Sequence, residues 1–241
     1  MEPGLYVVGT PIGNLQDITL RALDTLRQAD VILAEDTRVT QRLCARHEIR
    51  APLVSCHRFN EEARTERVLA EIRAGRAVAL VTDSGMPGVS DPGSRVVAAV
   101  RAAGHRATVL PGPSSVTAAL ALCGFGGHGF RFEGFLPHKS GARRRRLEEL
   151  AGEDVPTVLF ESPYRIPRLL DELAAALPDR EVFVGRELTK LYEECLSGTP
   201  ARLKAAFAGR PPRGEFVIVI RPAERRRAAA NGEDGEGGGD G

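Results

Sequence analysis

Short apolar runs alternate with amphipathic stretches along most of the chain, and the apolar runs predict strands. They are rich in β-branched residues and bounded by glycine, proline or polar residues, which is typical of strands buried in a sheet. We predict strands at residues 5–9, 31–35, 52–56, 77–83, 107–112, 157–162, 181–185 and 215–221. Between many of them leucines recur at helical spacing, as in Leu20, Leu23 and Leu26. Strands that alternate with helices predict an α/β fold with largely parallel pairing.

The chain divides near residues 112–120, where the fifth predicted strand ends in "PGPSS" and a glycine-rich segment follows soon after. We predict an N-terminal α/β domain at residues 1–114 and a C-terminal α/β domain, with fewer helices and a mixed sheet, at residues 115–224. Residues 225–241 are rich in glycine and acidic residues. Such a segment buries too little apolar surface to fold, so we predict a disordered tail.

Composition is that of an ordinary soluble protein, with 42% hydrophobic and 27% charged residues among 241. No apolar run approaches the roughly 18 residues that span a membrane, and no basic segment precedes a long apolar core at the N-terminus. We therefore expect neither a membrane span nor a signal peptide. The four cysteines form no CxxC pair, which argues against a disulfide framework or a zinc ribbon and favours the cytoplasm.

Three glycine-rich loops follow predicted strands. The loop "DSGMPGVSDPG" at 83–93 follows the fourth strand, "GTPIGN" at 9–14 the first, and "PGPSS" at 111–115 the fifth. Ligands of open α/β sheets lie outside the carboxyl ends of strands, so these loops are candidates to converge on one cleft. None matches GxGxxG or GxxxxGK[ST], which disfavours a nucleoside triphosphate. Asp91 precedes Pro92 and is predicted to cap the next helix. The alternative for 83–93 is an ordinary tight turn with this helix cap and no ligand.

Several motifs carry a resemblance to a known family. "GTPIGNLQDITLRAL", "AEDTR", "TDSGMPGVSDPG" and "LPGPSSVTAAL" resemble motifs of the tetrapyrrole methylase superfamily, in the same order and at similar spacing. Within that superfamily, "EGFLPHKSGARRRR", "FESPYRIPRLLDEL" and "GRELTK" resemble the ribosomal RNA small-subunit methyltransferase I family. The resemblance covers about residues 4–222, which is nearly all of the predicted folded chain.

This resemblance implies two α/β domains with S-adenosylmethionine bound in the cleft between them, and a homodimer. It implies methylation of the ribose 2′-hydroxyl of a decoding-centre cytidine of 16S rRNA, position 1402 in standard rRNA numbering, in the small ribosomal subunit. By motif position, the residues expected to bind the cofactor are Ile12, Asp83, Met86, Ser114, Ser115, Phe160, Gly185 and Glu215.

The implied chemistry narrows the search for catalytic residues. Methyl transfer from a sulfonium releases a neutral thioether, so we expect no metal site. The hydroxyl must be aligned at roughly 3 Å, and a general base or polarising group helps to remove its proton. The candidates are Glu35, Asp36, Arg38, His57, Glu61, Glu187 and Lys190. Structural alternatives are a helix cap with an ion pair in "AEDTR", a strand-end salt bridge in "RELTK" and a structural role for His57.

The strongest charge run is Arg143, Arg144, Arg145 and Arg146, with Lys139 just before it. Four consecutive helical residues, about 100° apart, point to every face of the helix. We predict that this run contacts RNA phosphates; a solvated helix face is the alternative. Phe130 and Phe132 are interpreted as core residues, with base stacking as the alternative.

Three functions compete at this point. The first is the ribose methyltransferase of ribosomal RNA, and the second is a methyltransferase of a porphyrin-like small molecule that uses the same cleft. The third is a nucleic-acid-binding or assembly protein without activity. The basic run, together with the lack of an obvious large apolar pocket, argues against the second. Acidic and basic residues at strand ends argue against the third.

Overall fold

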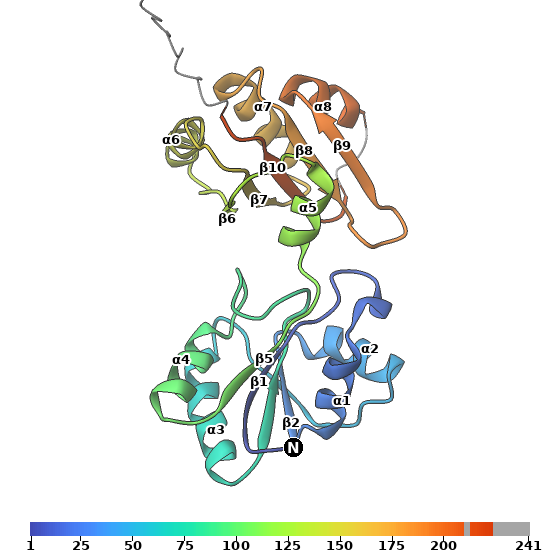
Figure 1. Cartoon of the computed structure of the whole chain (residues 1–241), viewed down its shortest axis with the longest axis vertical. Coiled ribbons are helices and arrows are strands. Elements are labelled where there is room, and N and C mark those ends of the chain that lie inside the picture. Colours follow the sequence, from blue (N-terminus) through green and yellow to red (C-terminus); the bar gives the residue numbers. More distant parts are fainter. Residues whose placement is uncertain (210–212, 224–241) are drawn as a thin grey trace, which may run out of the picture.

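The computed structural model describes residues 1–209 and 213–223, which form two α/β halves, each built on one five-stranded sheet (Figure 1). The elements of the first half are β1 (Gly4–Val8), η1 (Leu15–Asp17), α1 (Leu20–Gln28), β2 (Val31–Ala34), α2 (Thr37–Arg46), β3 (Leu53–Ser55), α3 (Glu61–Arg73), β4 (Ala77–Leu80), α4 (Ser94–Ala102) and β5 (Ala107–Leu110). The order β3-β2-β4-β1-β5 is parallel throughout. The carboxyl ends of β4, β1 and β5 therefore lie side by side.

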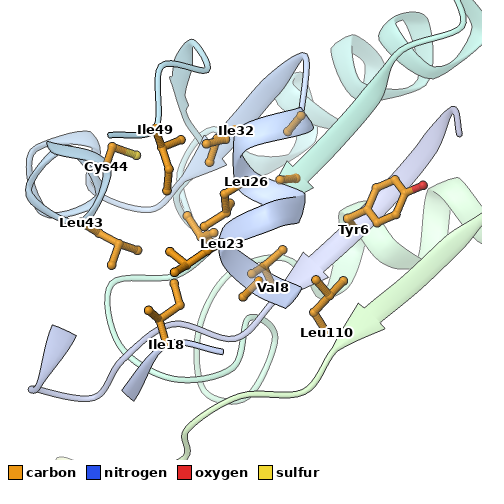
Figure 2. Packing of buried hydrophobic residues seen from close by; sticks show 14 of the residues in the cluster. Tyr6, Val8, Ile18, Leu23, Leu26, Ile32, Leu43, Cys44, Ile49 and Leu110 are labelled. Atoms are coloured by element: carbon orange, nitrogen blue, oxygen red, sulfur yellow. The ribbon is translucent and has the colours of Figure 1, made fainter. Parts of the chain in front are cut away.

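Side-chain alternation along the strands explains why helices cover both faces of this sheet. Tyr6 and Val8 of β1 point to one face, where they join a core with the apolar side chains of α1 and α2 (Figure 2). Leu5 and Val7 point to the other face, toward α3 and α4. Because all five residues of β1 are buried, this strand reads as a continuous apolar run rather than an alternating one.

The second half contains a mixed sheet of order β6-β7-β10-β8-β9, parallel only between β6 and β7. Its elements are α5 (Ser115–Cys123), β6 (Arg131–Phe135), α6 (Ser140–Leu150), β7 (Thr157–Glu161), α7 (Ile166–Ala176), β8 (Val182–Arg186), β9 (Glu194–Gly198), α8 (Pro200–Phe207) and β10 (Phe216–Ile220). Helices α6, α7 and α8 pack on one face of the sheet. Helix α5 packs on the other face, which is turned toward the first half (Figure 1).

A shared apolar cluster joins the two halves. Ile12, from the loop after β1, packs with Val116 and Ala119 of α5 and with Phe183 and Val217 of the second sheet. A polar contact adds to it, because the backbone N–H of Asn14 donates to the Thr189 hydroxyl at 3.1 Å. The loop after β1 is therefore fixed by residues from both halves of the chain.

The predicted α/β fold and the mixed second sheet are confirmed, whereas strands β6 and β9 were missed. Strand β9 is an edge strand with no buried residue, and β6 carries only one, so neither has an apolar run. The domain boundary at 114/115 remains a prediction, and α5 begins at Ser115. The predicted tail, 225–241, lies outside the described residues. No helix in the described part of the chain is long and apolar enough to cross a membrane.

Candidate active site between the two sheets

A cavity of about 360 Å³ lies between the two halves. This volume is within the range of roughly 300–1,000 Å³ that is usual for small-molecule sites. The first half contributes the loops after β1, β4 and β5, and the second half contributes the ends of β6, β7 and β8 and the start of β10. The wall is formed by Ile12, Ser84, Gly85, Met86, Val89, Ser90, Asp91, Ser114, Ser115, Val116, Phe135, Phe160, Glu161, Ser162, Pro163, Gly185, Leu188, Gly214, Glu215, Phe216 and Val217.

Close backbone contacts hold the loops of the first half together at the cavity. A Cβ atom on Gly9 would lie 2.7 Å from Cα of Gly112 and 2.6 Å from Sδ of Met86, so only glycine fits there. The loop after β4 is also paired with the loop after β1, because Thr10 and Gly85 exchange backbone hydrogen bonds. These contacts explain how glycine-rich loops after β1, β4 and β5 converge on one cavity.

Seven of the eight residues expected to bind the cofactor line this cavity, and Asp83 alone does not. Its Oδ1 atom accepts a hydrogen bond of 2.9 Å from the backbone N–H of Asp36, at the start of α2. Burial raises the pKa of Asp83, partly offset by that hydrogen bond, and the nearby carboxylates of Glu35 and Asp36 add to the rise. Asp83 therefore links the loop after β4 to the loop after β2 instead of forming the wall.

The "AEDTR" motif forms a network at the carboxyl ends of β2 and β4. The Thr82 hydroxyl donates to Glu35 Oε2 at 2.6 Å. Asp36 caps α2 by accepting from the backbone N–H of Arg38 at 2.9 Å, and it also pairs with the Arg38 guanidinium. The hydrogen bonds from Arg38 lower the pKa of Asp36 to about 2. None of these candidates lines the cavity, and this arrangement therefore gives no support to a direct catalytic role for them. Such a role for Glu35, Asp36 or Arg38 remains a prediction.

Asp91 is a wall residue that the sequence assigned to a helix cap, and that assignment was wrong. Helix α4 begins at Ser94 with Gly93 as its N-cap, and Glu61 Oε1 accepts from the backbone N–H of Gly93 and of Arg95 at 2.9 and 3.0 Å. Glu61, a catalytic candidate, is thus a buried cap. Asp91 stands in the cavity wall instead.

The environment of Asp91 raises its pKa toward neutrality. Burial raises the pKa of Asp91 to about 6, the carboxylates of Glu35 and Asp83 add to the rise, and the Thr82 hydroxyl opposes it. A carboxyl group with a pKa near neutrality in a cavity wall is a candidate proton acceptor at physiological pH. The sequence feature that could have pointed to Asp91 as a site residue is its place as the second aspartate of the loop 83–93.

The "RELTK" motif forms an ion-pair cluster beside the cavity. Lys190 Nζ lies 2.9 Å from Glu187 Oε1 and 3.0 Å from Oε2 of the wall residue Glu215. Burial acts to lower the pKa of Lys190, but the two carboxylates outweigh it and the pKa is raised. Burial likewise acts to raise the pKa of Glu187, but hydrogen bonds from Lys190 and the Glu215 backbone lower it. Lys190 is therefore a fixed cation and not a proton acceptor.

His57 lies away from the cavity, just beyond β3. Its backbone N–H donates to the Asn60 side chain at 2.8 Å, its ring nitrogen Nε2 lies 3.2 Å from Asn60 Nδ2, and its ring is 6.1 Å from that of Phe59. It is not a wall residue. A catalytic role for His57 has no support from this arrangement. Residues 1–209 and 213–223 contain no group of three or more His, Cys, Asp or Glu that could hold a metal.

Comparison with known proteins places this chain in a family. The model of the tetrapyrrole (corrin/porphyrin) methylases matches residues 4–204. Relatives named ribosomal RNA small subunit methyltransferase I are 44% identical in Neisseria meningitidis serogroup A, covering 91% of this chain and 76% of the relative, and 44% identical in Thermotoga maritima, covering 90% and 97%. The chain belongs to the ribosomal RNA small subunit methyltransferase I family. The resemblance seen in its motifs is therefore confirmed.

Solved structures of other methyltransferases share the fold of this family member. A cobalt precorrin-4 methyltransferase superposes with a TM-score of 0.67 at 23% identity, covering 90% of this chain and 93% of the other. The uroporphyrin-III C-methyltransferase of Thermus thermophilus, solved with S-adenosylhomocysteine, gives 0.63 at 22% identity and covers 90% and 96%. At such identities the likeness establishes the tetrapyrrole methylase fold alone.

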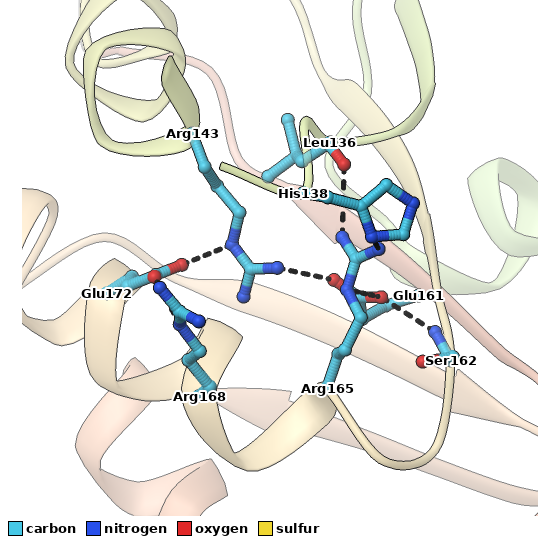
Figure 3. A network of polar contacts seen from close by, with 8 residues as sticks. All are labelled: Leu136, His138, Arg143, Glu161, Ser162, Arg165, Arg168 and Glu172. Carbon is cyan, nitrogen blue, oxygen red and sulfur yellow. Dashed lines mark hydrogen bonds and ion pairs between the residues drawn. The ribbon is translucent and has the colours of Figure 1, made fainter. Parts of the chain in front are cut away.

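The structure corrects the prediction for the first arginine of the basic run. Arg143 is 2% exposed, and its guanidinium lies between Glu172 and Glu161, with Nη1 3.5 Å from Glu161 Oε2 (Figure 3). Glu161 is also buried, and its Oε1 lies 2.9 Å from Arg165 Nε. The prediction of phosphate contact treated all four arginines alike, because the sequence of the run does not reveal which face of the helix is buried. Arg143 instead holds α6, α7 and the end of β7 together.

The rest of the predicted RNA-binding run is partly neutralised. Arg146 pairs with Glu133 and with Glu149, and Arg144 lies 3.7 Å from Glu148. Lys139 and Arg145 are exposed and have no ion pair among the described residues. RNA contact remains a prediction for the exposed members of the run. Fewer unpaired positive charges are available for it than four consecutive arginines suggest. Of the two phenylalanines predicted as core residues, Phe132 is half-buried and packs edge-on against Phe160, whereas Phe130 is exposed and that prediction was wrong.

Proposed function

We propose that the protein methylates ribosomal RNA with S-adenosylmethionine as the methyl donor. The observation that carries the proposal is the cavity between the two halves, combined with family membership over nearly the whole chain. The relatives named for ribosomal RNA are 40–44% identical, whereas the corrin and porphyrin methyltransferases of similar fold are 21–25% identical. This difference favours RNA over a porphyrin-like substrate.

The cavity wall suits a donor that carries a positively charged sulfonium. Among the described residues of the wall, the ionisable ones are all acidic, namely Asp91, Glu161 and Glu215, and none is a lysine, arginine or histidine. Apolar side chains such as Ile12 and Phe160 offer surface to an aromatic base and a thioether, while serines at the start of α5 offer hydrogen bonds. When bound, the sulfonium supplies an activated methyl group. Ile12, Met86, Ser114, Ser115, Phe160, Gly185 and Glu215 would hold this donor.

The proposed acceptor is the 2′-oxygen of the cytidine at position 1402 in the decoding centre of 16S rRNA. A ribose hydroxyl is a weak nucleophile until its proton leaves, so a proton acceptor is needed beside it. Asp91 takes that proton on its carboxylate, because its pKa of about 6 leaves it mostly ionised near pH 7 and still basic. Glu161 and Glu215 are less suited because each is held in an ion pair with an arginine or lysine.

The proposed partners follow from the same substrate. The protein would act on the small ribosomal subunit in the cytoplasm and, as its family resemblance implies, as a homodimer. Two exposed apolar side chains support a contact with another chain. Leu191 and Tyr192, in the loop between β8 and β9, are 88% and 74% exposed. The two side chains are adjacent in the sequence, and contiguous exposed apolar surface marks interaction sites.

The test is to map the methyl group. Purified protein is incubated with radiolabelled S-adenosylmethionine and small ribosomal subunits that lack the modification, and the labelled RNA is digested to nucleosides. We expect label on the 2′-oxygen of one cytidine of 16S rRNA. Label on a base, or transfer to a porphyrin-like compound but not to RNA, contradicts the proposal.

A further inference from the structure

The outer face of α2 carries a stripe of arginines that lie outside the cavity wall. Arg38, Arg42 and Arg46 follow each other at four-residue intervals, which places them one above the other on a helix. Arg50 follows four residues later, just past the end of α2, and all four are exposed. The buried residues of α2 are Thr40, Leu43 and Cys44. We call Arg42, Arg46 and Arg50 the α2 stripe. Arg38 precedes the stripe on the same face and is not counted in it.

The α2 stripe is not neutralised by the protein. Among the described residues, Arg42, Arg46 and Arg50 have no carboxylate within ion-pair distance, and of these four arginines only Arg38 has a partner, Asp36. This contrasts with the basic run on α6, most of which is paired with glutamates. Unpaired guanidinium groups at regular spacing repel one another, so binding of an anion lowers the electrostatic free energy of this surface.

The position of the stripe connects it with the active site. Asp36, the N-cap of α2, donates its backbone N–H to Asp83 in the loop after β4. The rise from Arg38 to Arg46 is about 12 Å, so the stripe leads away from the cavity region along one side of the first half. An open groove of about 760 Å³ runs beside it, lined by Arg38, Gln41 and Arg50, among others. The groove thus presents hydrogen-bond donors next to the positive charges.

We propose that the α2 stripe binds the phosphate backbone of the RNA substrate, which rests on the function proposed above. Arginine binds phosphate oxygens through a planar set of donors, and a row of three arginines engages consecutive phosphates without reading base identity. The stripe positions the RNA, while the cavity performs the methyl transfer. The competing interpretation is that the α2 stripe binds an acidic protein instead of RNA.

The experiment measures the salt dependence of RNA binding. Full-length protein is titrated with small ribosomal subunits that lack the modification, at several salt concentrations. Each phosphate contact contributes roughly 0.7–0.9 to the slope of log affinity against log salt. For Arg42→Gln with Arg46→Gln, we expect a slope shallower by about 1.4–1.8 and affinity lower by roughly tenfold or more. Adding Arg50→Gln reduces the slope by about 0.7–0.9 again.

The matched control is Arg73→Gln with Arg101→Gln. These arginines are exposed at the ends of α3 and α4, on the opposite layer of the first half, and also have no ion pair among the described residues. We expect the control to bind as the unaltered protein does, and both variants to keep the same melting temperature and affinity for S-adenosylhomocysteine. Equal slopes for the stripe variant and the control overturn the inference. If the unaltered protein transfers no methyl group to the subunits, the proposed function fails instead.

Discussion

Replacing Arg143 with alanine is expected to lower the free energy of unfolding by about 3 kcal/mol, because it leaves a buried carboxylate without one of its partners. The side chains of Arg143 and Glu161 are 2% and 0% exposed, so water cannot take the place of the guanidinium. Arg165 still pairs with Glu161, which keeps the loss below that of an isolated buried charge. Equilibrium unfolding in urea measures the change.

Arg145→Ala is the matched control, because it makes the same substitution two residues away on an exposed part of α6. Surface substitutions of this kind usually change stability by about 0.5 kcal/mol or less. If Arg143→Ala were no more destabilising than Arg145→Ala, the buried network of Figure 3 would contribute nothing to the fold. The arrangement of α6, α7 and β7 would then need another explanation.

Replacing Asp91 with asparagine is expected to lower the rate of methyl transfer by roughly 10²–10⁴-fold, the usual contribution of a positioned general base. In the unaltered protein, the rate should rise with pH until Asp91 is ionised, near its pKa of about 6, and then level off. The variant should lose this rise, because asparagine does not titrate. Single-turnover rates measured between pH 5 and pH 8 test both expectations.

The stability of the Asp91→Asn variant shows whether a lower rate comes from the loss of a base or from unfolding. The pKa of Asp91 is raised from 3.8 to about 6 in the folded protein. Between these values the folded state binds more protons than the unfolded state, so the contribution of Asp91 to stability falls as pH rises and stays unfavourable above pH 6. Asp91→Asn should therefore be about 1 kcal/mol more stable at pH 7.5, a figure reduced for the partial exposure of the group. A stable variant with an unchanged rate would exclude Asp91 as the base.

Much of the fold could be predicted from sequence because the buried strands are continuous apolar runs. Strand β1, for example, is buried along its whole length and is followed by a glycine loop. The cavity wall could also be predicted in outline, since loops at the carboxyl ends of neighbouring parallel strands must meet. Ile12, Met86 and Ser114 lie where this rule and the motif resemblance place them.

The roles of charged residues could not be predicted in the same way, because they depend on contacts between distant segments. Arg143 is buried because Glu161 and Glu172 face it from β7 and α7, and no local pattern reveals those partners. Glu61 caps α4 from 32 residues away. Asp91 was taken for that cap because it precedes a proline, and its place in the cavity wall became visible only with the second half in position.

The central claim is that the cavity between the two halves binds the methyl donor, and calorimetric titration with S-adenosylhomocysteine tests it most directly. Val89 is a wall residue that is 44% exposed, so Val89→Trp fills the cavity without overpacking the core. Val109→Trp on the edge strand β5, 53% exposed and outside the wall, is the matched control. The account predicts affinity weakened by roughly tenfold or more for Val89→Trp and unchanged for Val109→Trp. Equal affinities for the two variants and the unaltered protein would contradict it.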